Sequence, residues 1–205
     1  MVIEQMKNLS IKRLLDLVIS ISLIILTLPL LLIISISIKV FSEGPILHWS
    51  KRVGKNNVIF NMPKFRTMSV NTPQLATHLL RNPKKNITKI GFFLRKSSLD
   101  EIPQLWSVII GDMSLVGPRP DVPGYADKLN KKEKKITSIR PGITGPASLE
   151  YANEEYLLSK VKSPKRYNDK VIYPNKIKIN LHYIENWSFF LDLKLILKTI
   201  FRKDY

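Results

Sequence analysis

The longest apolar run in the chain extends from Leu17 to Ile38 without a charged residue and consists mostly of leucine and isoleucine. As a helix that rises ~1.5 Å per residue, this run is long enough to cross the ~30 Å hydrocarbon layer of a bilayer. It is too long for the core of a signal peptide, and no small-residue cleavage motif follows it. The pattern predicts a retained membrane segment within residues 1–41 and one compact domain over residues 42–205.

Pro29 stands near the middle of the apolar run. It predicts a sharp bend, because proline removes a backbone hydrogen bond and clashes with the preceding turn. Cations flank the run on both sides, whereas a spanning helix normally shows its lysine and arginine excess on one side only. This favours a hairpin that enters and leaves the membrane by the same face, with Thr27, Ser35 or Ser37 as partners for freed backbone groups. The residues alone leave open both this hairpin and a proline-kinked spanning helix.

The remaining chain alternates short apolar runs with turn residues, which predicts an α/β domain that is mostly helical and carries a small β-hairpin. The two strands of the hairpin are predicted over Ile46–Val53 and Val58–Phe60, around the turn-rich residues 54–57. Residues 72–87 are expected to form a surface excursion and residues 111–120 a tight loop. Residues 147–180 show no clear pattern and contain Pro164 and Pro174 as expected breakers. Helices are predicted after Thr88, over Pro103–Ile110, over Tyr125–Ile136 as an exposed basic helix, and after Ser188.

The last predicted helix is amphipathic. Its apolar face is formed by Phe189, Leu193, Ile196 and Ile200, and its basic face by Lys194, Lys198 and Arg202. The apolar face either packs on the core or lies in the headgroup layer of a membrane. Core packing is the preferred interpretation.

The composition is strongly basic. Lysine and arginine total 33 against 16 acidic residues, which gives a formal net charge of +17 and a pI of about 10.0. This charge predicts attraction to phosphates in nucleic acid, anionic lipid or small molecules. Cysteine is absent, which excludes a disulfide framework and any cysteine-based zinc site or nucleophile.

Against this positive background, Asp100 and Glu101 form an adjacent acidic pair just before the predicted helix that starts at Pro103. One interpretation is a capping box, because Ser98 precedes Glu101 by three positions. Pro103 weighs against it, since proline prefers the first helical position and pushes the residue before it toward extended geometry. In the other interpretation the two acids stand just outside the helix and carry chemistry. The residues alone do not decide between these two interpretations.

Five stretches occur together with the apolar segment: residues 12–16 (KRLLD), 64–68 (KFRTM), 98–105 (SLDEIPQL), 111–120 (GDMSLVGPRP) and 140–145 (RPGITG). In combination they resemble the bacterial sugar transferase family, the small monotopic phosphoglycosyl transferases, over nearly the whole chain. The resemblance implies a re-entrant N-terminal membrane helix, one cytosolic domain with interfacial helices, and both termini on the cytoplasmic face of a bacterial plasma membrane. It also implies transfer of a phosphosugar from a UDP-sugar to polyprenyl (undecaprenyl) phosphate, the start of a lipid-linked surface glycan.

The resemblance further implies roles for individual residues. Asp100 is expected to attack the β-phosphorus, release UMP and hold a covalent phosphosugar until polyprenyl phosphate resolves it. Glu101 is expected to act as a general base or as an organiser of the site. A Mg²⁺ ion is expected between the diphosphate and Asp100. Substrate contacts are expected from Lys64, Arg66, Arg95, Arg119, Arg140 and Thr144.

Three places depart from the family pattern. Phe92 stands where a basic residue is common, Ser50 where many relatives carry glutamine, and residues 146–148 (PAS) where tryptophan and glutamine are frequent. The last change lies where sugar discrimination is expected, so the donor sugar is not read from the sequence. Expected partners are the two substrates and membrane lipids, without nucleic acid, and a homo-oligomer is left open. The competing interpretation is a membrane-tethered basic module that binds anionic lipid or nucleic acid without catalysis.

Overall fold

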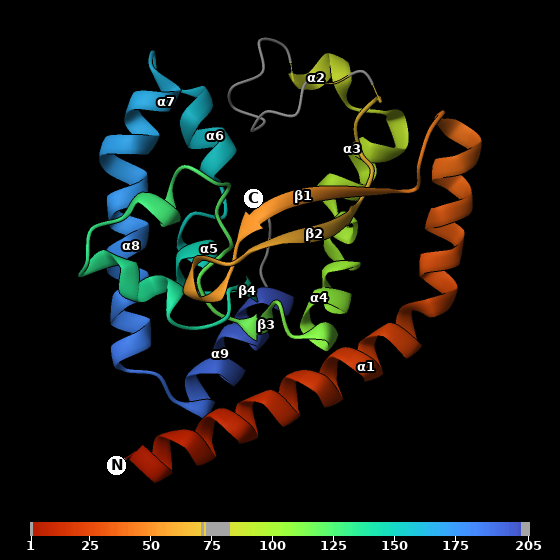
Figure 1. Cartoon of the computed structure of the whole chain (residues 1–205). Helices are drawn as coiled ribbons and strands as arrows, with labels where there is room; N and C mark the ends of the chain where they lie inside the picture. Colours follow the sequence, from red (N-terminus) through yellow and green to blue (C-terminus); the bar gives the residue numbers. More distant parts are fainter. Residues whose placement is uncertain (1, 71, 73–82, 202–205) are drawn as a thin grey trace.

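A computed structural model describes residues 2–70, 72 and 83–201 of the protein. It is mostly helical, as expected, and its strands form two small sheets (Figure 1). The predicted excursion over residues 72–87 lies mostly outside the described residues. The helices are α1 (Val2–Phe41), α2 (Pro83–Asn86), α3 (Lys89–Lys96), α4 (Gln104–Ile110), α5 (Pro146–Glu150), α6 (Glu154–Ser159), α7 (Pro164–Tyr167), α8 (Tyr173–Glu185) and α9 (Phe189–Ile200). The strands are β1 (Leu47–Val53), β2 (Ile59–Phe65), β3 (Ser114–Val116) and β4 (Gly142–Thr144).

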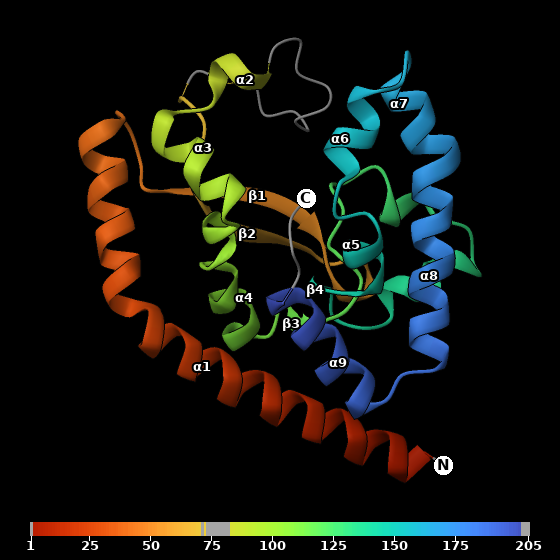
Figure 2. The same cartoon turned by 180° about the vertical axis from the view of Figure 1, so that it is seen from behind.

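Helix α1 is one continuous helix with Pro29 inside it. Its portion from Ser10 to Phe41 is long and apolar enough to cross a membrane, and little of it is buried against the rest of the protein. Figures 1 and 2 show the helix turning sharply between two arms, one passing α9 and α4 and the other rising beside α3. The hydroxyls of Thr27, Ser35 and Ser37 donate to the carbonyls of Leu23 (2.7 Å), Leu31 (2.7 Å) and Ile33 (2.8 Å). The carbonyl that Pro29 leaves without its helical donor is that of Ile25, four residues earlier, so the predicted bonding of these side chains to freed groups is wrong.

The N-terminal arm of α1 is anchored in the globular domain by the polar residues of the KRLLD stretch. Lys12 forms a salt bridge with Asp192 of α9. Arg13 donates to the carbonyls of Val108 (2.7 Å) and Ile109 (2.9 Å) at the end of α4, where helical carbonyls lack their usual partners in the next turn. These contacts bind the arm to two elements that lie far along the chain.

Asp16 extends the same anchor to β3. Its buried carboxylate accepts hydrogen bonds from the hydroxyl of Ser114 (2.7 Å) and the amide of Leu115 (3.1 Å). Buried carboxylates are costly unless they are hydrogen-bonded in this way. Helix α1 and the core of the domain are therefore one packed unit.

The C-terminal arm of α1 contacts the same domain through apolar packing. Ile34 and Ile38 are buried in a cluster with Phe65 of β2 and Leu94 of α3. Burial of side chains of this size contributes roughly 1.5–3 kcal/mol each. Both ends of the apolar helix thus rest on one globular body.

The predicted hairpin is confirmed by β1 and β2, which pair antiparallel. Strand β2 continues beyond the predicted end to Phe65, because Phe60, Met62 and Phe65 are buried and stabilise a longer extended segment. Directly opposite residues include the pair His48 and Lys64. The longer strand carries Lys64 toward the acidic pair.

The prediction of a plain loop over residues 111–120 is wrong, because this stretch contains β3. Strand β3 pairs in parallel with β4, with Ser114 opposite Gly142 and Val116 opposite Thr144. A Cβ atom on Gly142 would lie 2.1 Å from the amide nitrogen of Gly117, so only glycine allows the two backbones to approach this closely. Strands of three residues are too short to show a periodic pattern in a sequence.

The predicted basic helix over Tyr125–Ile136 is also wrong. The segment forms two short 3₁₀ turns, Ala126–Lys128 and Glu133–Thr137, which bury Ala126 and Ile136. Between them the side chain of Asn130 accepts hydrogen bonds from the amides of Lys132 and Glu133, both at 3.0 Å. Asparagine competes with helical hydrogen bonding in this way, which interrupts the helix.

Pro164 occupies the first turn of α7, whereas Pro174 lies inside a continuous helical stretch in which the π-helical turn Asn168–Ile172 joins α7 to α8, so neither proline breaks the helix. The uninformative stretch 147–180 is therefore largely helical, and α8 covers one side of the domain (Figures 1 and 2).

Helix α9 begins as predicted, with the hydroxyl of Ser188 accepting from the amide of Leu191 at 3.2 Å. Its predicted core face is confirmed only at Ile196, which packs against the core, whereas Phe189, Leu193 and Ile200 are 42%, 41% and 66% exposed. The buried positions are Asp192 and Leu195. The reason is electrostatic: Asp192 is neutralised by Lys12 and accepts hydrogen bonds from buried partners, which turns this side of the helix inward.

Candidate active site

The acidic pair lies in a short 3₁₀ turn, Leu99–Glu101, between α3 and α4. The side chain of Thr88 caps α3 by accepting from the amide of Gly91 at 2.9 Å. A Cβ atom on Gly91 would lie 2.1 Å from the carbonyl oxygen of Thr67, so glycine lets α3 pack directly on the chain that follows β2. This packing fixes the position of α3 and therefore the position of the turn with Asp100 that follows it.

The capping-box interpretation is wrong. Ser98 adopts a left-handed conformation with φ of 55°, and its side chain makes no capping hydrogen bond. Pro103 directly precedes the first residue of α4, close to the predicted start. A left-handed conformation in a non-glycine residue costs roughly 1 kcal/mol or more and is found at sites where the surrounding structure holds it. Here it separates the end of α3 from the 3₁₀ turn that carries the two carboxylates.

Glu101 is held by two cations. Lys64 donates to its Oε1 atom at 2.7 Å, and Arg119 donates through two nitrogens, one of them to Oε2 at 3.2 Å. Burial alone would raise the pKa of Glu101, but the charges and hydrogen bonds of Arg119 and Lys64 outweigh it and hold this pKa well below its usual range. Glu101 is therefore a fixed anion that positions two cations beside Asp100.

Asp100 has the opposite character. Its side chain is buried, with 8% of the residue exposed. Burial raises the pKa of Asp100, and the charge of Glu101 raises it further, while Lys64 and Arg95 oppose the shift. Among the described residues no side chain hydrogen-bonds to its carboxylate. A desolvated carboxylate without a committed partner is suited to act on a substrate.

The structure brings together Lys64, Arg95 and Arg119 of the predicted substrate residues, with Asp100 and Glu101. Lys64 comes from the end of β2 and Arg95 from the last turn of α3. Arg119 follows β3 in a rigid segment between two prolines. Three basic side chains from separate parts of the chain thus surround one acidic pair.

Arg66 is not brought to this cluster. Its guanidinium donates to the backbone carbonyls of Ser42 (3.0 Å), Glu43 and Pro45 (2.6 Å). It is buried and holds the connection between α1 and β1.

Arg140 and Thr144 also have structural contacts. Arg140 donates to the carbonyl of Gly111 at 2.6 Å, at the end of α4 opposite to Asp100. The hydroxyl of Thr144 lies 2.6 Å from that of Thr199, which joins β4 to α9.

Sequence reasoning missed two residues that lie close to the segment of Arg119, namely Asp121 and Arg52. The carboxylate of Asp121 accepts a hydrogen bond from the hydroxyl of Tyr173 at 2.9 Å, and burial raises the pKa of Asp121 to about 6. Arg52 of β1 approaches the same segment, with its Nη1 atom 3.4 Å from the carbonyl of Pro120. In the sequence, Arg52 was marked only by its place in the predicted hairpin, and Asp121 only by its place close to Arg119.

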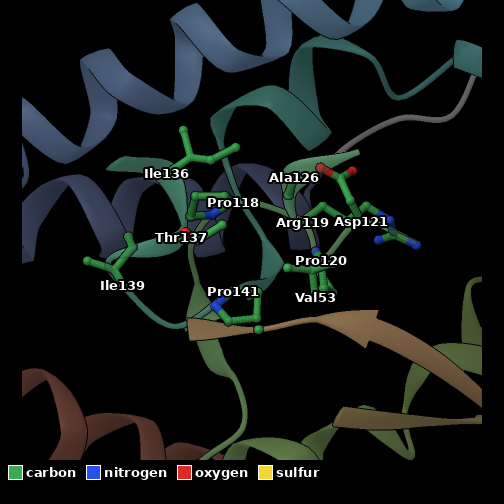
Figure 3. A pocket seen from close by; sticks show the side chains of 11 residues that line it. Val53, Pro118, Arg119, Pro120, Asp121, Ala126, Ile136, Thr137, Ile139 and Pro141 are labelled. Carbon is green, nitrogen blue, oxygen red and sulfur yellow. The ribbon is translucent and has the colours of Figure 1, made fainter. Parts of the chain in front are cut away.

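A small cavity lies next to Arg119 and is lined by Pro118, Pro120 and Pro141 together with Val53 of β1 (Figure 3). Its volume of about 20 Å³ holds roughly one water molecule. It is too small for a nucleotide or a sugar, and its proline lining keeps the Arg119 segment rigid.

The donor set near Asp100 suits a metal shared with a substrate. Within residues 2–70, 72 and 83–201 there is no group of three or more His, Cys, Asp or Glu side chains that would form a cage for a metal ion. Mg²⁺ is commonly held by one or two carboxylates together with substrate phosphates. Asp100 offers an uncommitted carboxylate for this purpose, whereas both oxygens of Glu101 already face cations.

Residues 7–203 match the family described as bacterial sugar transferase. The chain belongs to this family. It is 36% identical over 168 residues to the galactosyl transferase CpsE of Streptococcus agalactiae, a match that covers 77% of this chain and 34% of that protein. It is 35% identical over 201 residues to the undecaprenyl-phosphate glucose phosphotransferase of Komagataeibacter xylinus, which covers 95% of this chain and 36% of that protein.

A third relative, the uncharacterized sugar transferase EpsL of Bacillus subtilis, is 32% identical over 190 residues, with 93% of this chain and 85% of that protein covered. This sugar transferase chain therefore spans little more than a third of the length of CpsE and of the Komagataeibacter protein. The names of these two relatives refer to different sugars, galactose and glucose.

Proposed function

We propose that the chain transfers a sugar-1-phosphate from a UDP-sugar to undecaprenyl phosphate through a covalent intermediate on Asp100. The observation that carries the proposal is the contrast within the acidic pair. Glu101 is fixed by Lys64 and Arg119, whereas the buried carboxylate of Asp100 has no committed side-chain partner among the described residues. The names of several family members, which refer to undecaprenyl-phosphate sugar transfer, support the substrates.

The reaction proceeds in two displacements at one phosphorus atom. A carboxylate oxygen of Asp100 attacks the β-phosphorus, the bond from this phosphorus to the bridging oxygen breaks, and UMP leaves with that oxygen. An oxygen of undecaprenyl phosphate then attacks the same phosphorus. This second step breaks the acyl-phosphate bond, forms the lipid-linked diphosphate sugar and restores the carboxylate of Asp100.

The cations around the pair stabilise the developing phosphate charge. Lys64 and Arg119 are held in place by Glu101, and Arg95 lies close enough to Asp100 to oppose the rise in its pKa. Because its own pKa is so low, Glu101 is a poor general base, which favours its role as organiser. Mg²⁺, when bound by Asp100 and the diphosphate, neutralises substrate charge.

We also propose that α1 is re-entrant and that the site faces the cytoplasm at the bacterial plasma membrane. The support is geometric: Lys12 and Asp16 of one arm and Ile38 of the other contact the same globular domain. A straight spanning helix would carry its two ends to opposite faces of the bilayer. The competing binding module gives no reason for a buried carboxylate that lacks a side-chain partner within the described residues beside one that is held by two cations.

The test is UMP release from a panel of UDP-sugars by the full chain in detergent, with polyprenyl phosphate and Mg²⁺. Asp100→Asn is expected to lower the rate by about 10³-fold or more, because it removes the nucleophile. Asp112→Asn is the matched control, since Asp112 is a partly exposed acid at the far end of α4. With donor alone, the wild-type protein should gain the mass of a phosphosugar and the Asp100→Asn protein should not. Equal UMP release by Asp100→Asn and Asp112→Asn would contradict the proposal.

A further inference from the structure

Arg52 lies on the same face of the β1–β2 hairpin as Lys64. In the register of the hairpin, Arg52 is opposite Phe60, Ser50 is opposite Met62, and His48 is opposite Lys64. Directly opposite residues share a face, and residues two positions apart on a strand share a face as well. The face that presents Lys64 to Glu101 therefore also presents Arg52, a residue that lies outside the sequence motifs.

The guanidinium of Arg52 is only weakly engaged. Its Nη1 atom is 3.4 Å from the carbonyl of Pro120, and its Nε atom is 3.4 Å from the hydroxyl of Ser50. Both distances are at the long limit of a hydrogen bond. Arginine carries five N–H donors, and Arg52 forms no salt bridge within the part of the chain that the structure describes. Most of its binding capacity is unused.

The neighbouring acids are already committed elsewhere. Both oxygens of Glu101 accept from Lys64 or Arg119, and the carboxylate of Asp121 accepts from Tyr173. Arg52 is partly buried. Burial lowers its pKa, the charge of Arg119 lowers it further, and Asp121 and Glu101 act in the opposite direction. A partly buried cation beside a second cation is costly unless an anion joins them.

We propose that Arg52 binds a phosphate group of one of the two substrates, next to the phosphate-binding surface formed by Lys64 and Arg119. A planar guanidinium with free donors suits bidentate binding of a phosphate. The phosphate supplies the negatively charged partner that no side chain of the described residues provides for Arg52. The identity of the substrate rests on the proposed function, whereas the binding of a phosphate by Arg52 rests on the geometry alone.

The experiment measures equilibrium binding to the full chain in detergent, with UDP as one probe and a polyprenyl phosphate as the other. Arg52→Gln is expected to weaken binding of one probe by about 10- to 100-fold, the loss of one charge-assisted contact. Arg52→Lys should recover part of the affinity, because it keeps the charge and loses the fork geometry. Lys51→Gln is the matched control: Lys51 is exposed on the opposite face of the same strand, and the substitution removes the same charge.

The two probes separate the two sources of phosphate. A loss confined to UDP assigns Arg52 to the nucleotide donor, and a loss confined to polyprenyl phosphate assigns it to the lipid acceptor. The inference is overturned if Arg52→Gln and Lys51→Gln bind both probes alike while the thermal unfolding curves show both proteins folded. Failure of the proposed function gives a different result. In that case the wild-type protein binds UDP but does not release UMP from UDP-sugars, and Arg52→Gln still weakens binding.

Discussion

Lys12 in the N-terminal arm of α1 forms a salt bridge with Asp192 in α9, although 180 positions separate them in the chain. The same carboxylate accepts hydrogen bonds from the hydroxyl of Tyr183 (2.6 Å) and the indole of Trp187 (3.0 Å). Lys12 is therefore held on the globular domain that Ile38, at the other end of the apolar segment, also contacts. This relationship bears directly on how the helix meets a membrane.

The first prediction concerns topology. The chain contains no cysteine, so single cysteines introduced by Glu4→Cys and Lys162→Cys report separately on the start of α1 and on the globular domain. In intact cells both are expected to react with a membrane-permeant maleimide and neither with an impermeant one, because both arms of α1 contact the same domain, which the proposed topology places in the cytoplasm. Lysed cells provide the control, in which both cysteines should react with either reagent. Labelling of the Glu4→Cys protein alone by the impermeant reagent would show that α1 spans the bilayer.

The second prediction concerns the clamp on Glu101. Arg119→Lys keeps the charge but loses one of the two parallel hydrogen bonds, so Glu101 and the phosphate-binding surface are less well positioned. The catalytic efficiency kcat/KM for UMP release is expected to fall by about 10- to 100-fold. Arg166→Lys, an exposed exchange in α7, serves as control and should leave the rate unchanged. An unaltered kcat/KM in the Arg119→Lys protein would rule out the clamp as part of the site.

The third prediction concerns pH and Asp121. Its pKa is raised by burial from 3.8 to about 6, so between these values the folded protein binds more protons at this group than the unfolded chain. The contribution of Asp121 to stability is therefore most favourable below about pH 4 and declines as the pH rises to about 6. Asp121→Asn removes this dependence while it keeps an acceptor for Tyr173.

Thermal unfolding of the wild-type and Asp121→Asn proteins from pH 4 to pH 8 measures the effect. Relative to the variant, the wild type is expected to lose about 1–3 kcal/mol of stability over the lower part of that range and to stay level above about pH 6.5. Asp127→Asn is a suitable control, because this acid lies nearby on the 3₁₀ turn Ala126–Lys128. A constant difference between wild type and Asp121→Asn at every pH would show that Asp121 does not titrate in this range.

Several features followed from the sequence because their causes are local. The capping side chains of Thr88 and Ser188 bond to amides three residues later, and Pro103 directly precedes α4. The extended geometry expected of Ile102 before this proline is wrong, because Ile102 belongs to the end of the 3₁₀ turn and has helical dihedral angles (φ −54°, ψ −38°). The apolar run around Pro29 and the alternation in the hairpin are likewise readable over a few residues. The acidic pair was conspicuous in the sequence because it stood out from a basic background.

Tertiary structure alone decided which cations serve the site. Arg66, Arg119 and Arg140 look equivalent in the sequence, yet Arg66 binds carbonyls of Ser42–Pro45 and Arg140 binds the end of α4. Only Arg119 reaches Glu101, because its partner is chosen by the packing of β3 and α4 and not by its neighbours in the chain.

The orientation of α9 illustrates the same limit. Its apolar periodicity predicted a core face, but Asp192 turned inward once Lys12, Tyr183 and Trp187 were there to pair with it. A buried charge is tolerable only with such partners, and these come from distant or differently packed segments. The sequence by itself determined the long apolar helix, the β1–β2 hairpin, the starts of α3 and α9 and the presence of the acidic pair; the assembly of α1, β3 and α9 decided which faces are buried and which cations meet Glu101, because those choices depend on contacts between residues far apart in the chain.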